Sequence, residues 1–174
     1  MKKISSATTP SGILGIFKLP KQPAFKENKP GLVLAHIADP GNMGTLIRTA
    51  AALNVTTIIC IQGADPWSPK VVQASAGTIG AVTIFRMTWD ELITIKQSQP
   101  LCALVTPEHS NAQPIETARC PNGLLVIGSE AHGLPKEYVA SCDKKLTIFM
   151  PGAAESLNAA VAGSLAAYVI FKRS

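Results

Sequence analysis

The chain has 174 residues, a length that favours one domain whose core is stable without disulfides or a structural metal ion. Apolar residues make up 47% of it and charged residues only 16%, which excludes a disordered chain. The net charge of +5 comes entirely from residues 1–29, which excludes a uniformly basic surface. Because few charges remain to cover the body, we expect an exposed apolar patch and a homo-oligomer.

Residues 1–29 are predicted to form a basic, extended leader rather than a domain. They contain six lysines against one glutamate, and prolines at positions 10, 20 and 23. A basic arm on a neutral body favours a polyanion, bound through salt-sensitive phosphate contacts, although a solvated tail is the alternative. No apolar run follows Lys2 and Lys3, so we predict no signal peptide and a cytoplasmic protein.

From residue 30 onward, short apolar strands alternate with helices. We predict helices at residues 43–53, 69–76, 89–97, 135–141 and 155–171, and strands at residues 31–37, 56–61, 81–85, 101–105, 124–127 and 146–149. Strands that are apolar on both faces and separated by helices are typical of an α/β fold with a mostly parallel sheet. Residues 30–174 are therefore predicted to form one domain with helices on both faces of that sheet.

Two features that resemble metal or membrane signals are better explained by packing. The cysteines have no CxxC spacing, so we predict reduced core residues and no metal site: Cys60, Cys102, Cys120 and Cys142. The apolar segment 157–171 is shorter than the ~20 residues that a membrane span needs, and it contains polar residues. The spacing of Ala159, Gly163 and Ala167 predicts instead a helix that packs closely on a neighbour.

The first of three unusual loops lies at residues 39–48. In an α/β sheet ligands bind beyond the carboxyl ends of strands, and this loop follows the first strand. We expect Asn42 to cap the next helix and Arg48 to lie between one and two turns further on. A capped helix with a surface arginine is the plain alternative. Neither GxGxxG nor GxxxxGK[ST] is present, which argues against dinucleotide and P-loop sites.

The second loop, residues 128–135, follows the strand at 124–127. Glu130 stands between Gly128 and Gly133, a position poorly suited to packing and well suited to a ligand. A serine hydrolase is disfavoured, because Ser129, Glu130 and His132 are too close in the chain to form a nucleophile–base geometry, and no GxSxG is present.

The third loop, residues 150–158, again follows a strand and leads into a helix. Its Pro-Gly turn at 151–152 exposes backbone groups that could hold a small molecule. Ser156 and Asn158 are expected in the first helical turn. The alternative is that Ser156 simply caps the helix.

Together, and in this order, the three loops resemble the SpoU (TrmH-like) family of SPOUT RNA methyltransferases. The motif N-x-G-x-x-x-R is matched by Asn42, Gly44 and Arg48. The motif G-[SN]-E-x-x-G-L is matched by residues 128–134, and the third motif by residues 149–152 and 156–162. The resemblance covers residues 30–171, and the three motifs combined are far more specific than any one of them.

The resemblance implies a C-terminal deep trefoil knot, bound S-adenosylmethionine, and methyl transfer to an RNA ribose 2′-hydroxyl by a homodimer, without a metal ion or a membrane. The implied cofactor pocket comprises Thr106, Pro107, Gly128, Ile148, Met150, Gly152 and Leu157. The implied catalytic residues are Arg48, Asn42, Glu130, Ser156 and Asn158. Because a guanidinium keeps its proton above pH ~12, we expect Arg48 to bind a phosphate and stabilise the developing alkoxide, with the other four orienting it and the hydroxyl.

Two features depart from the family pattern. Ala131 and His132 follow the glutamate where many relatives have a second glycine, and the RNA-binding domain that opens many relatives is not seen in the sequence. Residues 8–14 resemble the junction after that domain, so the chain is expected to be either a catalytic fragment or a short form that uses its leader. We expect rRNA as the substrate. A tRNA methyltransferase and a non-enzymatic RNA-binding or ribosome-assembly factor are the alternatives.

Overall fold

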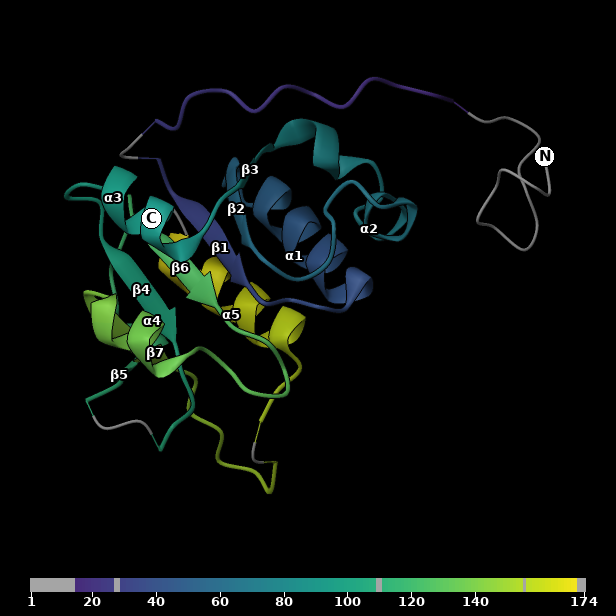
Figure 1. Cartoon of the computed structure of the whole chain (residues 1–174). Coiled ribbons are helices and arrows are strands. Elements are labelled where there is room, and N and C mark those ends of the chain that lie inside the picture. Colours follow the sequence, from purple (N-terminus) through teal and green to yellow (C-terminus); the bar gives the residue numbers. More distant parts are fainter. Residues whose placement is uncertain (1–14, 27–28, 109–110, 155, 172–174) are drawn as a thin grey trace.

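The computed structural model describes residues 15–26, 29–108, 111–154 and 156–171, and its centre is a 7-stranded sheet (Figure 1). The strand order is β3-β2-β1-β6-β4-β7-β5, and every pairing is parallel. The strands are β1 (Gly31–Ala35), β2 (Thr57–Ile61), β3 (Thr83–Arg86), β4 (Leu101–Leu104), β5 (Gln113–Pro114), β6 (Leu124–Ile127) and β7 (Lys144–Thr147). The predicted α/β class and parallel sheet are confirmed.

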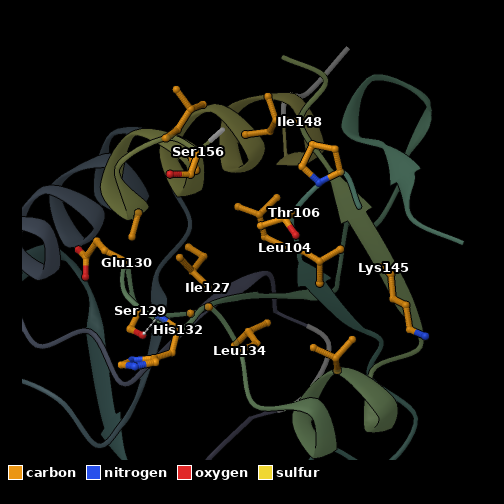
Figure 2. A pocket seen from close by; sticks show the side chains of 18 of the residues that line it. Leu104, Thr106, Ile127, Ser129, Glu130, His132, Leu134, Lys145, Ile148 and Ser156 are labelled. Atoms are coloured by element: carbon orange, nitrogen blue, oxygen red, sulfur yellow. Dashed lines mark hydrogen bonds between the residues drawn. The ribbon is translucent and has the colours of Figure 1, made fainter. Parts of the chain in front are cut away.

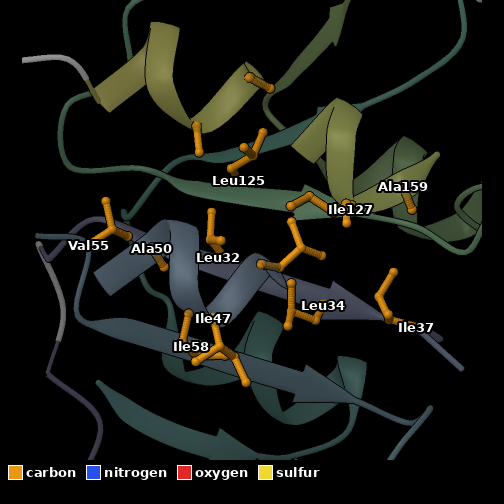
Figure 3. Packing of buried hydrophobic residues seen from close by; sticks show 14 of the residues in the cluster. Leu32, Leu34, Ile37, Ile47, Ala50, Val55, Ile58, Leu125, Ile127 and Ala159 are labelled. Atoms are coloured by element: carbon orange, nitrogen blue, oxygen red, sulfur yellow. The ribbon is translucent and has the colours of Figure 1, made fainter. Parts of the chain in front are cut away.

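Helices cover both faces of this sheet because successive strand residues point to opposite sides. Leu32 and Leu34 of β1 belong to one core, while Val33 between them belongs to the other. The first core is covered by α1 (Pro40–Ala52), α2 (Pro69–Ala74) and α5 (Ala159–Phe171), and Figure 3 shows α1 and α5 packed over β1, β2 and β6. The second is covered by α3 (Trp89–Ile95) and α4 (Lys136–Ser141).

The capping predictions for two helices are wrong. Helix α1 begins at Pro40, and its cap is Asp39, whose Oδ1 accepts a hydrogen bond from the Asn42 backbone N at 2.8 Å. Asn42 therefore lies in the first turn, where its side chain is free for other contacts. Helix α5 begins at Ala159, after Asn158, whose Oδ1 accepts from the backbone N of residues 160 and 161. Ser156 lies before that cap, so neither the predicted first-turn placement nor capping by Ser156 holds.

Several short elements were also not predicted, and two strands are displaced. The 3-10 helices η1 (Thr78–Ala81) and η2 (Ile115–Thr117) and the two-residue strand β5 lie in segments without apolar periodicity. Strand β3 begins two residues later than predicted, and β7 begins two residues earlier. The early start of β7 includes Lys144 and Lys145, which are only partly buried because β7 lies near the sheet edge.

The small-residue face of α5 packs inside the chain, as its close-packing pattern predicts. A Cβ added to Gly163 would lie 2.7 Å from the side-chain ends of both Leu46 and Ile127. The hydroxyls of Thr49 and Ser164 form a 2.9 Å hydrogen bond between α1 and α5. This face therefore cannot also support the predicted homodimer.

The cysteines are free thiols, and three of the four are buried, which agrees with their prediction as core residues. Burial raises the pKa of the Cys60 thiol from 9.0 to about 12. Cys102 Sγ lies 2.8 Å from Cys120 Sγ, and this hydrogen bond lowers the pKa of the Cys120 thiol. No helix among the described residues is long and apolar enough to cross a membrane.

Only residues 15–26 and 29 of the predicted leader are described; residues 1–14 and 27–28 lie outside the described residues. The stretch 15–26 contains no helix or strand and runs along the body toward β1 (Figure 1). Gln22 Oε1 accepts a 2.8 Å hydrogen bond from the backbone N of Arg86, at the free edge of β3, and Phe25 packs on Phe85. The leader therefore covers part of that edge.

Candidate active site

A cavity of about 690 Å³ opens at the carboxyl edge of the sheet, within the size range of small-molecule sites (Figure 2). Its walls are the loops that follow β4, β6 and β7, together with the start of α5. These are the positions where a parallel sheet presents its strand ends. Two of the three unusual loops of the sequence therefore meet at one cavity.

Most of the predicted cofactor residues line this cavity: Thr106, Pro107, Gly128, Ile148, Met150 and Leu157. Gly152 does not. It is exposed, and neither Pro151 nor Gly152 lines the cavity, so the Pro-Gly turn is not part of the cavity wall. Of the predicted catalytic residues, Glu130 and Ser156 also line it.

The loop after β6 presents Glu130 because it folds into a tight turn. The backbone N of Gly133 donates to the Ser129 carbonyl at 2.9 Å, and the His132 N donates to the Ser129 hydroxyl at 3.3 Å. Gly133 has φ +63, a left-handed conformation that favours glycine. A Cβ at Gly128 would lie 2.6 Å from the Leu134 N. Both glycines are therefore needed for the turn that exposes the carboxylate.

Three predicted catalytic residues form one hydrogen-bonded chain. Asn42 Nδ2 donates to Glu130 Oε1, and Asn158 Nδ2 donates to Asn42 Oδ1 at 3.0 Å. Because Asn158 Oδ1 also caps α5, the chain ties together α1, the loop after β6 and the start of α5. The Asn42 amide therefore holds the Glu130 carboxylate in one orientation, and Asn158 in turn holds the Asn42 amide.

Residues 30–168 match the sequence model of the family described as the SpoU rRNA Methylase family. This chain belongs to that family. It is 26% identical over 166 residues to 23S rRNA (guanosine(2553)-2′-O)-methyltransferase RlmP of Bacillus subtilis (strain 168). The aligned stretch covers 95% of this chain and 66% of the relative. The chain spans between about half and two thirds of the length of this and other curated relatives.

Solved structures agree with the SpoU assignment. A Porphyromonas gingivalis protein assigned to the TrmH family of RNA methyltransferases superposes with a TM-score of 0.87 at 30% identity, covering 99% of this chain and 71% of that one. The SpoU methyltransferase AviRb from Streptomyces viridochromogenes, in complex with AdoMet, superposes with a TM-score of 0.76 at 28% identity, covering 87% of this chain and 64% of that one.

Arg48 of this SpoU-family chain stands apart from the other candidates. It is exposed on α1, about 9 Å along the helix axis from Asn42 at 1.5 Å per residue. Among the described residues it forms no hydrogen bond or salt bridge with the four groups that were expected to orient it. Glu155, which precedes Ser156, lies outside the described residues.

Sequence reasoning missed several residues that line the SpoU cavity. Leu104 and Ile127 end strands, and Ala159 and Ala162 begin α5, so in the sequence they are indistinguishable from core positions. Lys136 and Lys145 also line the cavity, and Figure 2 shows Lys145 across it from Glu130. No sequence signal marked Lys145, because the predicted strand began after it, at residue 146, and the observed strand β7 begins with two lysines. No cluster of three His, Cys, Asp or Glu in the described part of the chain could hold a metal ion.

Proposed function

We propose that this chain is the catalytic part of an S-adenosylmethionine-dependent RNA methyltransferase that acts on a ribose 2′-hydroxyl, with rRNA as substrate. The observation that carries the proposal is the cavity of about 690 Å³ beside the Asn42–Glu130–Asn158 chain. Methyl transfer requires a pocket that holds the methyl donor and a fixed group that aligns the acceptor hydroxyl, and the cavity and the carboxylate beside it meet these two needs. Two relatives are named as 2′-O-methyltransferases of 23S rRNA, which favours rRNA over tRNA.

The cavity fits S-adenosylmethionine in size and chemistry. Ile127, Leu134 and Ile148 give it apolar walls suited to an adenine ring, and the loops after β4 and β6 supply backbone groups for the edge of that ring. When bound, S-adenosylmethionine supplies an activated methyl group. The fit needs no metal ligand.

The residues of the chain would then align the acceptor. Glu130, held by Asn42, accepts a hydrogen bond from the 2′-hydroxyl, and Ser156 at the same cavity limits where the ribose can sit. Arg48 binds a neighbouring phosphate and stabilises the charge that develops on the ribose oxygen. The basic residues 1–29 add salt-sensitive phosphate contacts.

We also propose a homodimer that pairs through the outer face of α5. Three large hydrophobic side chains lie at helical spacing on this face and are 48%, 46% and 53% exposed: Val161, Leu165 and Tyr168. An exposed apolar stripe of this kind is typical of a protein interface. Because Arg48 forms no hydrogen bond or salt bridge with the other candidates among the described residues of one chain, a shared site would give it a partner. Light scattering should report about twice 18.3 kDa for the wild type, and Leu165→Glu should give an inactive monomer. An active monomer would contradict the shared site.

A C-terminal trefoil knot and a cytoplasmic location complete the proposal. The knot is supported by the placement of the last elements, since β7 pairs with β4 whereas α5 packs on α1 and β6. A crystallographic trace of residues 144–171 tests it. The cytoplasmic location is proposed because rRNA, the proposed substrate, is in the cytoplasm.

The deciding experiment is methyl transfer from labelled S-adenosylmethionine to rRNA and tRNA from a strain that lacks the gene. Calorimetry with a chelator present measures cofactor binding separately. We expect binding and rRNA labelling by the wild type, and a large loss of labelling in Glu130→Gln. Glu137→Gln is the matched control, because Glu137 is exposed on α4 and does not line the cavity. Binding of RNA but not of cofactor would favour the non-enzymatic alternative, and labelling of tRNA alone would replace the substrate.

A further inference from the structure

A second, smaller cavity of about 240 Å³ lies against the turn that carries Glu130. It is lined by His36, Ser129, His132, Gly133 and Pro135. The turn residues 129, 132 and 133 line both cavities, so the two are neighbours, but His36 lines only the smaller one. The smaller cavity is below the usual range for whole drug-sized ligands and suits a single ring system.

His36 combines two energetically unfavourable features. It follows β1 with φ +59, a left-handed conformation that a non-glycine residue adopts only at a cost. Its Nε2 is buried without a hydrogen-bond partner among the described residues, a second unfavourable feature. The backbone is held by the neighbouring strand, because the His36 N donates to the Ile61 carbonyl at 2.9 Å. Because the neighbouring strand holds the His36 backbone in this strained conformation, and His36 lines a cavity, we expect His36 to take part in binding a ligand there.

The His36 ring also ends a row of three aromatic rings. Trp89 and Tyr138 stack with centroids 4.0 Å apart and an angle of 6°, and Tyr138 and His36 stack at 5.7 Å and 27°. Trp89 Nε1 donates to the Ser141 hydroxyl at 3.3 Å, which fixes the far end of the row. A further planar ring in the cavity would extend a stack that is already anchored in the second core.

We propose that this second cavity binds the base of the nucleotide whose ribose is methylated, an inference that rests on the proposed function. Proteins that act on single nucleotides of RNA splay the base out, stack it on aromatic or histidine rings and read its edge by hydrogen bonds. The cavity offers the His36 ring for stacking, with a hydroxyl at Ser129 and an imidazole at His132 for the edge. No lysine or arginine lines it, which disfavours a phosphate as the occupant. Since Glu130 adjoins Ser129, a base held here places its ribose beside the carboxylate.

A nucleotide titration tests the cavity without turnover. The full chain, saturated with S-adenosylmethionine, is titrated with millimolar AMP, GMP, CMP or UMP, and with ribose 5-phosphate as the base-free probe. The chain has 3 histidines, so the ring signals in NMR spectra can be assigned by single substitutions. We expect the His36 signal to move with at least one nucleotide and not with ribose 5-phosphate. No movement with any nucleotide, or equal movement with ribose 5-phosphate, overturns the proposal.

Variants test the same site during methyl transfer. His36→Gly removes the ring and suits the left-handed backbone, and His36→Asn keeps a polar group that tolerates it. Both should raise KM for RNA about tenfold, the loss typical of one stacked base, with an unchanged Kd for S-adenosylmethionine. Gln97→Gly is the matched control, since Gln97 also has a positive φ, +44, and lines neither cavity.

The two proposals fail in different ways. A chain that binds no cofactor or labels no RNA refutes the proposed function, whereas the nucleotide titration, repeated without S-adenosylmethionine, still decides the second cavity. A chain that methylates RNA with the same KM in His36→Gly as in wild type refutes the base site alone.

Discussion

Gly44→Ala should destabilise the protein, although the same change in an ordinary helix stabilises it. A glycine in a helix interior costs about 1 kcal/mol relative to alanine, so an unobstructed substitution would gain that amount. Gly44 lies where α1 meets α2, and its added Cβ would contact Ala74 Cβ and lie 2.9 Å from two backbone atoms, the Ala74 C and the Ser75 N. Backbone atoms cannot turn aside as the end of a side chain can. Overpacking of this kind costs about 1–3 kcal/mol, so after the helix gain of about 1 kcal/mol is subtracted we expect a net loss of up to about 2 kcal/mol.

Urea unfolding at neutral pH measures the difference. Thr45→Ala is the matched control on the exposed side of the same helix, and it should gain up to about 0.5 kcal/mol. Because Asn42 lies half a turn before Gly44, the displaced helix should also reduce methyl transfer in Gly44→Ala. If Gly44→Ala is instead more stable than wild type by the full helix gain, α1 and α2 do not meet as closely as described, and the reasoning fails.

Three further predictions follow from the site and the core. Asn158→Ala removes the cap of α5, so urea unfolding should show a loss of about 1 kcal/mol in stability, and methyl transfer should lose most of its rate. Asn158→Ser should keep the cap and the stability but still lose the activity, because serine cannot replace the amide that donates to Asn42. An active Asn158→Ser would contradict the role of the Asn42 bond. Arg48→Ala should lower the single-turnover rate by roughly 100-fold without weakening cofactor binding, and Arg48→Lys should restore little; a wild-type rate in Arg48→Ala would remove this residue from the chemistry. Since burial raises the pKa of Cys60 from 9.0 to about 12, its contribution to stability is complete below pH 9 and is lost as the pH rises toward 12. Cys60→Ala should therefore reduce the fall in stability above pH 9 by up to about 1.4 kcal/mol per pH unit, and an unchanged pH dependence would refute this cause.

The sequence was sufficient for the centre of the sheet because the central strands are buried on both faces. Strands β1, β2 and β6 are buried along their whole length, so each is a mainly apolar run that is visible without knowledge of its partners. The loops after them could likewise be identified, because glycines beside a charged residue are out of place in a core. That is how Glu130 and its turn were found.

Features set by contacts distant in the sequence could not be predicted. Asn42 has the side chain of a good cap, and only the structure shows that Asp39 caps the helix while Asn42 binds Glu130, 88 residues away. The left-handed backbone of His36 is held by Ile61, on a neighbouring strand, so no local pattern marks it. The late start of α5 has the same origin, because the cap at Asn158 is oriented partly by its bond to Asn42.

The bond between Asn42 and Asn158 joins residues 116 positions apart, and this separation has a consequence for the chain as it leaves the ribosome. At a synthesis rate of about 5–20 residues per second, Asn158 is synthesised roughly 6–23 s after Asn42. During that interval β1, α1 and β2 can pair locally, but the face of α1 that receives α5 is bare. The nascent protein therefore passes through a stage with an exposed apolar groove and no working site, and its period of greatest risk of aggregation ends only when the last helix is placed.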